Sequence, residues 1–333
     1  MIVTVRGAYA NAGDHVIGRQ AHALLARHVD DDIQSIDRRA ITDESYELMN
    51  RARVVLLTGG PAYQRRIHPT IYPIDLDRVK VPVVPFGLGW KDRADGDPAT
   101  FAFTPESLQF VRRLHEDTSV LSSARCIQTT ELLAHNGVDN VLMTGCPVWY
   151  DEARLDEDYR FPAKVRRLVI TAPAKPQGDT LALARHLARR FPDAERYLAF
   201  QAGYRAPSRL VTAQRYLGIA AAKHWGFTPV SFQGDAGAMM DFHAGMDLHV
   251  GYRVHAHLYS LSQRVTSLLF AEDSRAVGQT AATGGRAVLA SASIREKLAA
   301  VDGILDSRGD EVARAVERIR EVYPTMLRFL AQF

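Results

Sequence analysis

The heptapeptide GYRVHAH, residues 251–257, contains an arginine and two histidines at alternate positions. An arginine can bind a phosphate or carboxylate through paired N–H groups, and a histidine can transfer protons near neutral pH. If the segment is a strand, Arg253, His255 and His257 share one face, whereas a helix that begins at Arg253 places the two histidines on opposite faces. The sequence after His257 has no strict alternation and precedes another apolar run, so we predict a strand-to-helix junction near Gly251.

The same region holds other side chains that bind metals. Four histidines fall between residues 243 and 257, with Asp241 and Asp247 close by. Neither HExxH nor another known ligand spacing occurs, and the predicted helix separates the last two histidines. We therefore predict no metal site and interpret His243, His249 and His257 as structural histidines.

Three segments of the N-terminal half offer further chemistry. In RGAYANAGDHVIG, Asn11 and Asp14 precede a predicted helix, and Asp14 is either a helix cap or a base directed into a cleft. In LLTGGP, Gly59 and Gly60 allow a ligand or a second domain to approach the backbone, although a turn alone also explains them. In SSARCIQ, Arg125 lies at a strand-to-helix junction, where it either binds an anion or is solvated.

The elements that must position these residues alternate along the chain. Short runs rich in β-branched residues are separated by helical stretches, as in βαβ units around parallel sheets. The predicted strands cover residues 2–5, 31–36, 53–60, 81–87, 118–124, 140–145, 167–173, 196–201, 229–233, 246–251, 265–270 and 285–291. The predicted helices cover residues 14–29, 42–52, 104–116, 126–137, 179–191, 208–226 and 309–333, with a further helix after Gly251.

This rhythm stops once, at residues 151–165, which are acidic, contain a proline and have no apolar period. We predict that they form a linker between two α/β domains of Rossmann-like fold, residues 1–150 and 166–333. The two domains would face each other across a central cleft. The last helix belongs to the second domain, and Pro324 predicts a kink or break in it. Ligands of open parallel sheets bind outside the carboxyl ends of the strands, so the candidate loops should meet in the cleft.

Composition narrows the class of protein. The 333 residues are 47% hydrophobic and 24% charged, and 41 basic against 38 acidic residues leave a net charge of only +3, which does not favour nucleic acid as a partner. Cys126 and Cys146 are the only cysteines, which excludes a disulfide framework and suggests a reducing compartment. No secretion signal is recognisable, and no apolar run reaches the roughly 18 residues of a membrane span. We expect a cytoplasmic protein without an integral membrane segment.

Five segments resemble, in the same order, those of the polysaccharide pyruvyl transferase family. They are NAGDHVI, LLTGGP, VPVVPFGLGW, SSARCIQTTELLAHNGVDNVLMTGCP and GYRVHAHLYSLSQRVTSLLFAEDSRAVG. The resemblance implies a fold similar to that of type B glycosyltransferases. It also implies transfer of the enolpyruvyl unit of phosphoenolpyruvate to two hydroxyls of a sugar, which forms a cyclic pyruvate ketal and releases phosphate. Phosphoenolpyruvate is then a co-substrate, and neither a metal nor a cofactor is expected.

The family's motifs also imply roles for single residues. The arginine of its Ser-x-Arg-Asp motif falls on Arg125, its Arg-x-His motif falls on Arg253 and His255, and a later lysine falls on Arg275. The three arginines would bind the phosphate and carboxylate of the donor. His255 would be the general acid or the general base, and the sequence leaves open which of the two. Asp14 is a second catalytic candidate, and Asn11, Gly59 and Gly60 are further candidates for substrate binding.

The chain departs from the family at three positions. Cys126 stands where the family usually has aspartate, Pro61 where it often has a third glycine, and Arg275 where it has lysine. Arg275 keeps the positive charge but presents a planar fork instead of an ammonium group. Pro61 removes a backbone N–H donor, which suggests a different acceptor in that part of the cleft.

The acceptor would be a saccharide, free or carried on a nucleotide or a lipid, bound mainly by the N-terminal domain, with the donor on the C-terminal domain. A homo-oligomer stays open. Two other functions stay open as well, because a fold does not determine an activity. One is a type B nucleotide-sugar glycosyltransferase, and the other is a diverged binding protein without catalysis.

Overall fold

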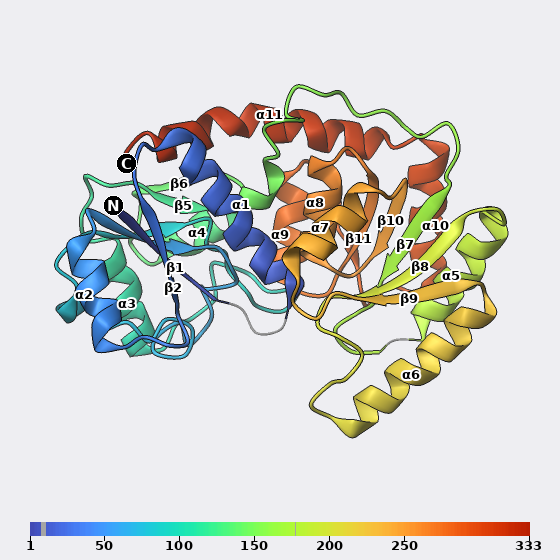
Figure 1. Ribbon diagram of the computed structural model, residues 1–333, viewed down its shortest axis with the longest axis horizontal. Coiled ribbons are helices and arrows are strands. Elements are labelled where there is room, and N and C mark those ends of the chain that lie inside the picture. The colour runs from blue at the N-terminus through green and yellow to red at the C-terminus, as the bar shows by residue number, and fades with distance from the viewer. Residues whose placement is uncertain (8–10, 177) are drawn as a thin grey trace.

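The computed structural model of the protein describes residues 1–7, 11–176 and 178–333. Figure 1 shows two α/β halves side by side, with the last helix running along both of them. Every strand pairing in the three sheets is parallel. The predicted α/β class with two Rossmann-like halves is therefore confirmed.

The N-terminal half contains a four-stranded sheet in the order β2-β1-β3-β4 and a two-stranded sheet of β5 and β6. Its strands are β1 (Ile2–Arg6), β2 (Ile33–Asp37), β3 (Val54–Thr58), β4 (Val83–Phe86), β5 (Ser122–Ala124) and β6 (Val141–Met143). Its helices are α1 (Ala12–His28), α2 (Asp43–Arg51), α3 (Pro105–Leu114), α4 (Ile127–His135) and the short 3-10 helices η1 (Leu76–Arg78) and η2 (Pro147–Trp149). The strand order reverses between β1 and β3, which is where such a sheet opens a crevice for ligands.

The C-terminal half contains one six-stranded sheet in the order β12-β11-β10-β7-β8-β9. Its strands are β7 (Arg167–Thr171), β8 (Glu195–Phe200), β9 (Phe227–Ser231), β10 (Leu248–Gly251), β11 (Thr266–Ala271) and β12 (Val288–Leu289). Its helices are α5 (Asp179–Arg190), α6 (Arg209–His224), α7 (Ala236–Ala244), α8 (Val254–Ser262), α9 (Ser274–Ala282), α10 (Ile294–Asp306) and α11 (Asp310–Leu330). This is the Rossmann strand order, and its reversal point lies between β7 and β10.

The two halves share a core. One cluster of buried hydrophobic residues includes Leu24 and Phe86 of the N-terminal half together with Leu248 and Phe329 of the C-terminal half. Helix α1 packs against α7 and α8 across the boundary. Between η2 and β7, in the segment predicted as a linker, the structure describes no helix or strand.

Helix α11 ends on the N-terminal half. The rings of Phe329 and Phe86 lie 5.0 Å apart, and the Gln332 side chain pairs with the backbone N–H and C=O of Leu121 at 2.7 and 3.1 Å. The predicted break at Pro324 is wrong, because α11 continues through it. The helix is buried both before and after the proline, where the side chains of Val322 and Met326 pack into the core.

Three helices lie where the sequence pattern predicted none: α7, α9 and α10. The first two are short, and α7 has little amphipathic signal because apolar residues occur all round it. The third begins with a capping box, in which the Ser293 side chain accepts from the N–H of Glu296 and the Glu296 side chain binds Ser293 in return. That Ser-x-x-Glu signature was readable in the sequence.

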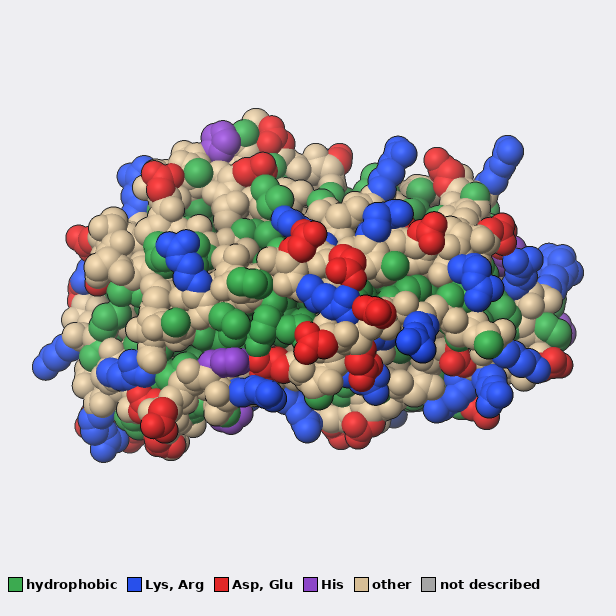
Figure 2. Space-filling view, turned by 90° about the horizontal axis from the view of Figure 1, so that it is seen from above, with side chains coloured by type: hydrophobic (Ala, Val, Ile, Leu, Met, Phe, Trp, Pro, Cys, Tyr) green, Lys and Arg blue, Asp and Glu red, His purple; other side chains and the backbone are tan. Residues whose placement is uncertain are grey.

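The face crossed by α11 shows no large patch of one charge. Figure 2 shows acidic and basic side chains intermixed on it. Within the described parts of the chain, no helix combines the length and apolar character needed to cross a membrane.

Candidate active site

The first turns of α1 and α8 meet where the two halves face each other. A Cβ on Gly13 of α1 would lie 3.0 Å from Nδ1 of His255 and 2.8 Å from Oε1 of Gln201. Only glycine allows this approach, because a Cβ contact at such distances forces a neighbour to move. The loop after β1 is thus brought against the loop after β10, as the strand reversal points predict.

His255 is the second residue of α8, and its side chain is only 4% exposed. Its Nδ1 lies 3.6 Å from Oδ1 of Asp14, whose other oxygen accepts a hydrogen bond of 2.9 Å from Nδ2 of Asn11. The cap of α1 is Asn11, whose side chain accepts from the N–H of Gly13, so Asp14 is not the helix cap and faces the histidine instead.

The environment of His255 keeps its ring neutral. Burial lowers the pKa of His255 to about 4, and the negative charge of Asp14 offsets only part of that effect. Nε2 is buried and has no hydrogen-bond partner in the described chain. A neutral imidazole with one ring nitrogen facing a carboxylate and the other unbonded is the arrangement of a general base.

His255 is therefore expected to titrate near pH 4 rather than near its ordinary value of 6.5. Imidazole ¹⁵N–¹H NMR of the folded protein measures this, with the signal assigned by its loss in His255→Gln. Asp14→Asn should lower the pKa of His255 further, since it removes the negative charge that raises this pKa most. A titration midpoint above about pH 6 would contradict this environment.

Arg125 follows β5 and is 1% exposed. Its guanidinium lies against Gly89, where a Cβ would come within 1.8 Å of Nε. None of its three guanidinium nitrogens has a hydrogen-bond partner among the described residues. Burial lowers the pKa of Arg125, which is the sign of a charge held away from water. A buried cation without a partner is costly, and an anionic ligand could offset that cost.

The backbone of Arg125 is held by both halves of the molecule. Its N–H donates to the carbonyl of Leu88 at 3.1 Å, and its carbonyl accepts from Nε2 of Gln279 on α9 at 2.6 Å. The Gln279 amide is fixed in turn by Nε1 of Trp149, which donates to its Oε1 at 2.9 Å. Gln279 is thus a positioning residue that sequence reasoning missed.

The other two predicted arginines are already partly engaged. Arg275 donates from Nε and Nη2 to the carboxylate of Asp273, the cap of α9, at 2.9 and 2.6 Å. Arg253, the cap residue of α8, donates from Nε to the carbonyl of Ala172 at 2.8 Å, and its Nη1 lies 3.8 Å from Glu272. Both are anchored in place, with less capacity for a ligand than Arg125.

A fourth cation, Lys91, was missed. It lies after the GLGW segment that supports Arg125, and burial lowers the pKa of its half-buried amine, with the charge of Arg275 acting in the same direction. The backbone N–H of its neighbour Asp92 donates to Oγ of Ser274 at 2.7 Å, and the backbone N–H of Ser274 donates to the carbonyl of Asp92 at 3.1 Å. This contact joins the loop that carries Lys91 to the start of α9, and the sequence of the loop alone does not reveal it.

The charged groups described above lie close enough together for their charges to interact. The charges of Arg125, Arg275, Asp273 and Asp14 act on both His255 and Lys91. The structure thus gathers one neutral histidine, the carboxylates of Asp14 and Asp273 and several cations at the boundary of the two halves. Such a set can bind a doubly anionic ligand and move a proton beside it.

The remaining candidates have mainly supporting contacts. Gly59 has φ +62°, and a Cβ there would lie 2.0 Å from Cγ2 of Ile17, so α1 packs directly on it. The carbonyl of Gly60 accepts from the N–H of Gly89 at 3.1 Å and so helps to hold the backbone on which the Arg125 guanidinium lies. Cys126 is buried against Gly278 of α9 and lies 3.2 Å from Oγ1 of Thr129.

His243, His249 and His257 form a buried cluster away from these groups. Nδ1 of His257 and Nδ1 of His249 each lie 2.7 Å from Oγ of Ser267, and Nε2 of His249 lies 2.9 Å from Oγ1 of Thr171. Burial lowers the pKa of His243 and of His257 to about 3. No group of three side chains suited to a metal occurs in the described residues, and the two histidines of GYRVHAH are separated as predicted.

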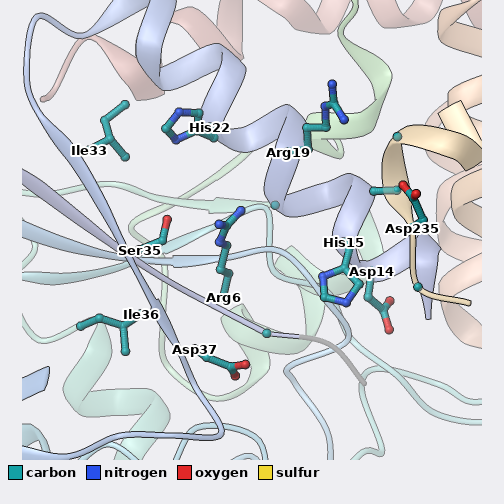
Figure 3. Close-up of a pocket in the computed structure, with 15 residues that line it drawn as sticks. Arg6, Asp14, His15, Arg19, His22, Ile33, Ser35, Ile36, Asp37 and Asp235 are labelled. Atoms are coloured by element: carbon teal, nitrogen blue, oxygen red, sulfur yellow. The ribbon is translucent and has the colours of Figure 1, made fainter. Parts of the chain in front are cut away.

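A cavity of about 880 Å³ opens beside Asp14, between β1, β2, α1 and the start of α7 (Figure 3). It is lined by Arg6, Gly7, Asp14, His15, Gly18, Arg19, His22, Ile33, Ser35, Ile36, Asp37, Gly234, Asp235, Ala236 and Gly237. Asp14 belongs to this lining and also faces His255, so the cavity adjoins the reactive groups.

Comparison with known proteins relates the chain to one protein family. The family model described as polysaccharide pyruvyl transferase matches residues 11–274. No curated protein sequence gives a match.

Solved structures of similar fold are nucleotide-sugar enzymes. The UDP complex of MnaA from S. aureus has a TM-score of 0.57 at 14% identity, covering 98% of this chain and 97% of that one. A putative UDP-N-acetylglucosamine 2-epimerase from Listeria monocytogenes has a TM-score of 0.58 at 13% identity over 94% and 90%. A glycosyltransferase from Rickettsia africae has a TM-score of 0.53 at 11% identity over 99% and 96%. At these identities the likeness shows the fold, which is that of type B glycosyltransferases.

Proposed function

Since this chain belongs to the polysaccharide pyruvyl transferase family, we propose that it uses phosphoenolpyruvate to place a pyruvate ketal on a sugar and releases phosphate. The observation that carries the proposal is the buried guanidinium of Arg125, unpaired and close enough to His255 for its charge to act on the histidine. A cation of this kind needs an anionic ligand, and a neutral histidine beside it can serve proton transfer.

The donor carries two anionic groups, a phosphate and a carboxylate. Arg125 would bind one of them with a full guanidinium fork, because none of its nitrogens is engaged by the described residues. Lys91 and the anchored Arg275 and Arg253 would supply further positive charge around the other. This arrangement neutralises the donor and stabilises the phosphate as it leaves, without requiring a metal.

The addition step needs one proton removed and one delivered. His255 would take the proton of the first sugar hydroxyl as its oxygen bonds to C2 of the donor, with Asp14 stabilising the imidazolium. The methylene carbon C3 gains a proton in the same step and becomes the methyl group, because attack at C2 alone would leave a carbanion at C3. The proton that His255 removes and the proton that C3 gains balance over the addition.

The second step closes the ketal. The bond between C2 and the phosphate oxygen breaks, and the electron pair leaves with the phosphate. The second sugar hydroxyl forms the other C2–O bond, and its proton ends on the released phosphate. No oxidant or reductant takes part.

The function is tested by incubating the protein with phosphoenolpyruvate and a panel of free, nucleotide-linked and lipid-linked saccharides. Phosphate release should depend on the acceptor, and mass spectrometry of the acceptor should show the gain of one pyruvate less one water. A titration with UDP-sugars serves as the control for a glycosyltransferase. Failure of phosphoenolpyruvate to bind, together with preferential binding of a UDP-sugar, would overturn the proposal.

A further inference from the structure

The cavity beside Asp14 is rich in basic side chains that lack partners. His15, Arg19 and His22 occupy one face of α1, at spacings of four and three residues, and Arg6 faces them from the end of β1. Figure 3 shows the Arg6 side chain extending into the space between His15 and His22. For none of these four does the described structure contain an ion pair or a side-chain hydrogen bond.

Three acidic side chains line the same cavity, and one of them is paired with a cation. Both oxygens of Asp37 accept from Arg39, with the Nε contacts at 3.0 and 3.2 Å. Asp235 caps α7 by accepting from the N–H of Ala238 at 3.0 Å, and one oxygen of Asp14 accepts from Asn11. The guanidinium groups of Arg6 and Arg19 are therefore the groups of this lining that are suited to an anionic ligand.

The residue types that line the cavity indicate which class of ligand it could bind. Among the described residues that line the cavity there is no Phe, Tyr or Trp, so charged and polar side chains are the groups that these residues offer to a ligand. The volume of about 880 Å³ is ample for a phosphorylated saccharide. Two arginines with two histidines suit a phosphate or diphosphate, which carries more charge than one carboxylate.

We propose that this cavity binds the phosphate or diphosphate group through which the acceptor sugar is carried, with Arg6 and Arg19 as its main ligands. The inference rests on the proposed function, because it assigns the acceptor side of that reaction. Asp14 joins the two sites. A sugar whose phosphate lies near Arg6 can therefore present its hydroxyls to Asp14, which faces His255.

The test is calorimetry with sodium pyrophosphate as the probe, in the presence and absence of saturating phosphoenolpyruvate. Pyrophosphate should bind the wild-type protein once while phosphoenolpyruvate is present. Arg6→Gln and Arg19→Gln should each weaken that binding about tenfold or more, which is the value of one charged hydrogen-bonding partner. The matched control is Arg27→Gln, on the same helix but paired with Glu152 at 3.5 Å outside the cavity, and it should leave binding unchanged.

The outcome separates this inference from the proposed function. If phosphoenolpyruvate does not bind but pyrophosphate binding still depends on Arg6 and Arg19, the cavity assignment stands and the donor assignment fails. If pyrophosphate binding is displaced by phosphoenolpyruvate, is lost in Arg125→Met and is unchanged in Arg6→Gln, the cavity assignment is overturned. Absence of pyrophosphate binding, or equally tight binding of glucuronate, overturns it as well.

Discussion

Arg125→Met is expected to abolish binding of phosphoenolpyruvate and at the same time to stabilise the fold. Binding should weaken about 100-fold or more, because one phosphate or carboxylate of the donor would lie in a buried site without its cation. Calorimetry with phosphoenolpyruvate measures this directly.

The gain in stability follows from the same geometry. Wild-type Arg125 is 1% exposed, and its guanidinium has no hydrogen-bond partner in the described structure. Methionine has a similar length and no charge, so the free energy of unfolding should rise by about 1–4 kcal/mol. Denaturant titration without ligand measures the change. A residue kept at a cost to stability is typical of a binding site.

The matched control is Arg264→Met. Arg264 donates to the carbonyls of Glu157, Leu155 and Ser262 at 2.7, 3.0 and 3.0 Å, so its loss should lower the free energy of unfolding by about 1–3 kcal/mol. Binding of phosphoenolpyruvate should be unchanged in this variant. If Arg125→Met destabilises the protein as Arg264→Met does and still binds the donor, Arg125 is a structural residue.

His255→Gln is expected to reduce kcat by about 10²- to 10⁴-fold, the contribution of a positioned acid or base, while the affinity for phosphoenolpyruvate stays near that of the wild type. The amide of glutamine fits the space but cannot carry a proton. Steady-state kinetics with a substrate from the acceptor panel gives kcat, and calorimetry gives the donor affinity.

His257→Gln is the control on the same helix. His257 is buried and bound to Ser267 away from Asp14, so its replacement should lower stability and leave kcat per folded molecule unchanged. Equal losses of kcat in the two variants would show that α8 responds to any change, and His255 would lose its assigned role. A fall in donor affinity with normal kcat in His255→Gln would have the same consequence.

Local patterns predicted much of this site. The separation of His255 from His257 follows from about 100° of rotation per residue once a helix begins after Gly251. The strands that end at Ala124 and Gly251 were readable from the sequence, and the candidate residues Arg125, Arg253 and His255 follow them directly. Asn11 and Asp14 were correctly placed at the start of a helix, although which of them caps it was not.

Other parts depend on contacts between distant segments. Arg125 is held by Gln279, 154 positions later, and its guanidinium lies on Gly89. The loop that carries Lys91 is joined to α9 by the hydrogen bond of Asp92 to Ser274, 182 positions later. Gly59 serves the packing of Ile17, which a glycine pair in a loop does not reveal.

The sequence by itself determined the alternation of strands and helices, and hence the parallel sheets and the edge of each sheet where chemistry gathers. These features follow from hydrophobic periodicity and backbone preferences, which act over a few neighbouring residues. Only the tertiary structure decided which charges are neutralised. Among the described residues Arg275 is paired with Asp273, whereas the guanidinium of Arg125 has no hydrogen-bond partner. Burial and pairing depend on distances in space between groups far apart in the chain, and these distances set both the pKa of His255 and the need of Arg125 for an anion.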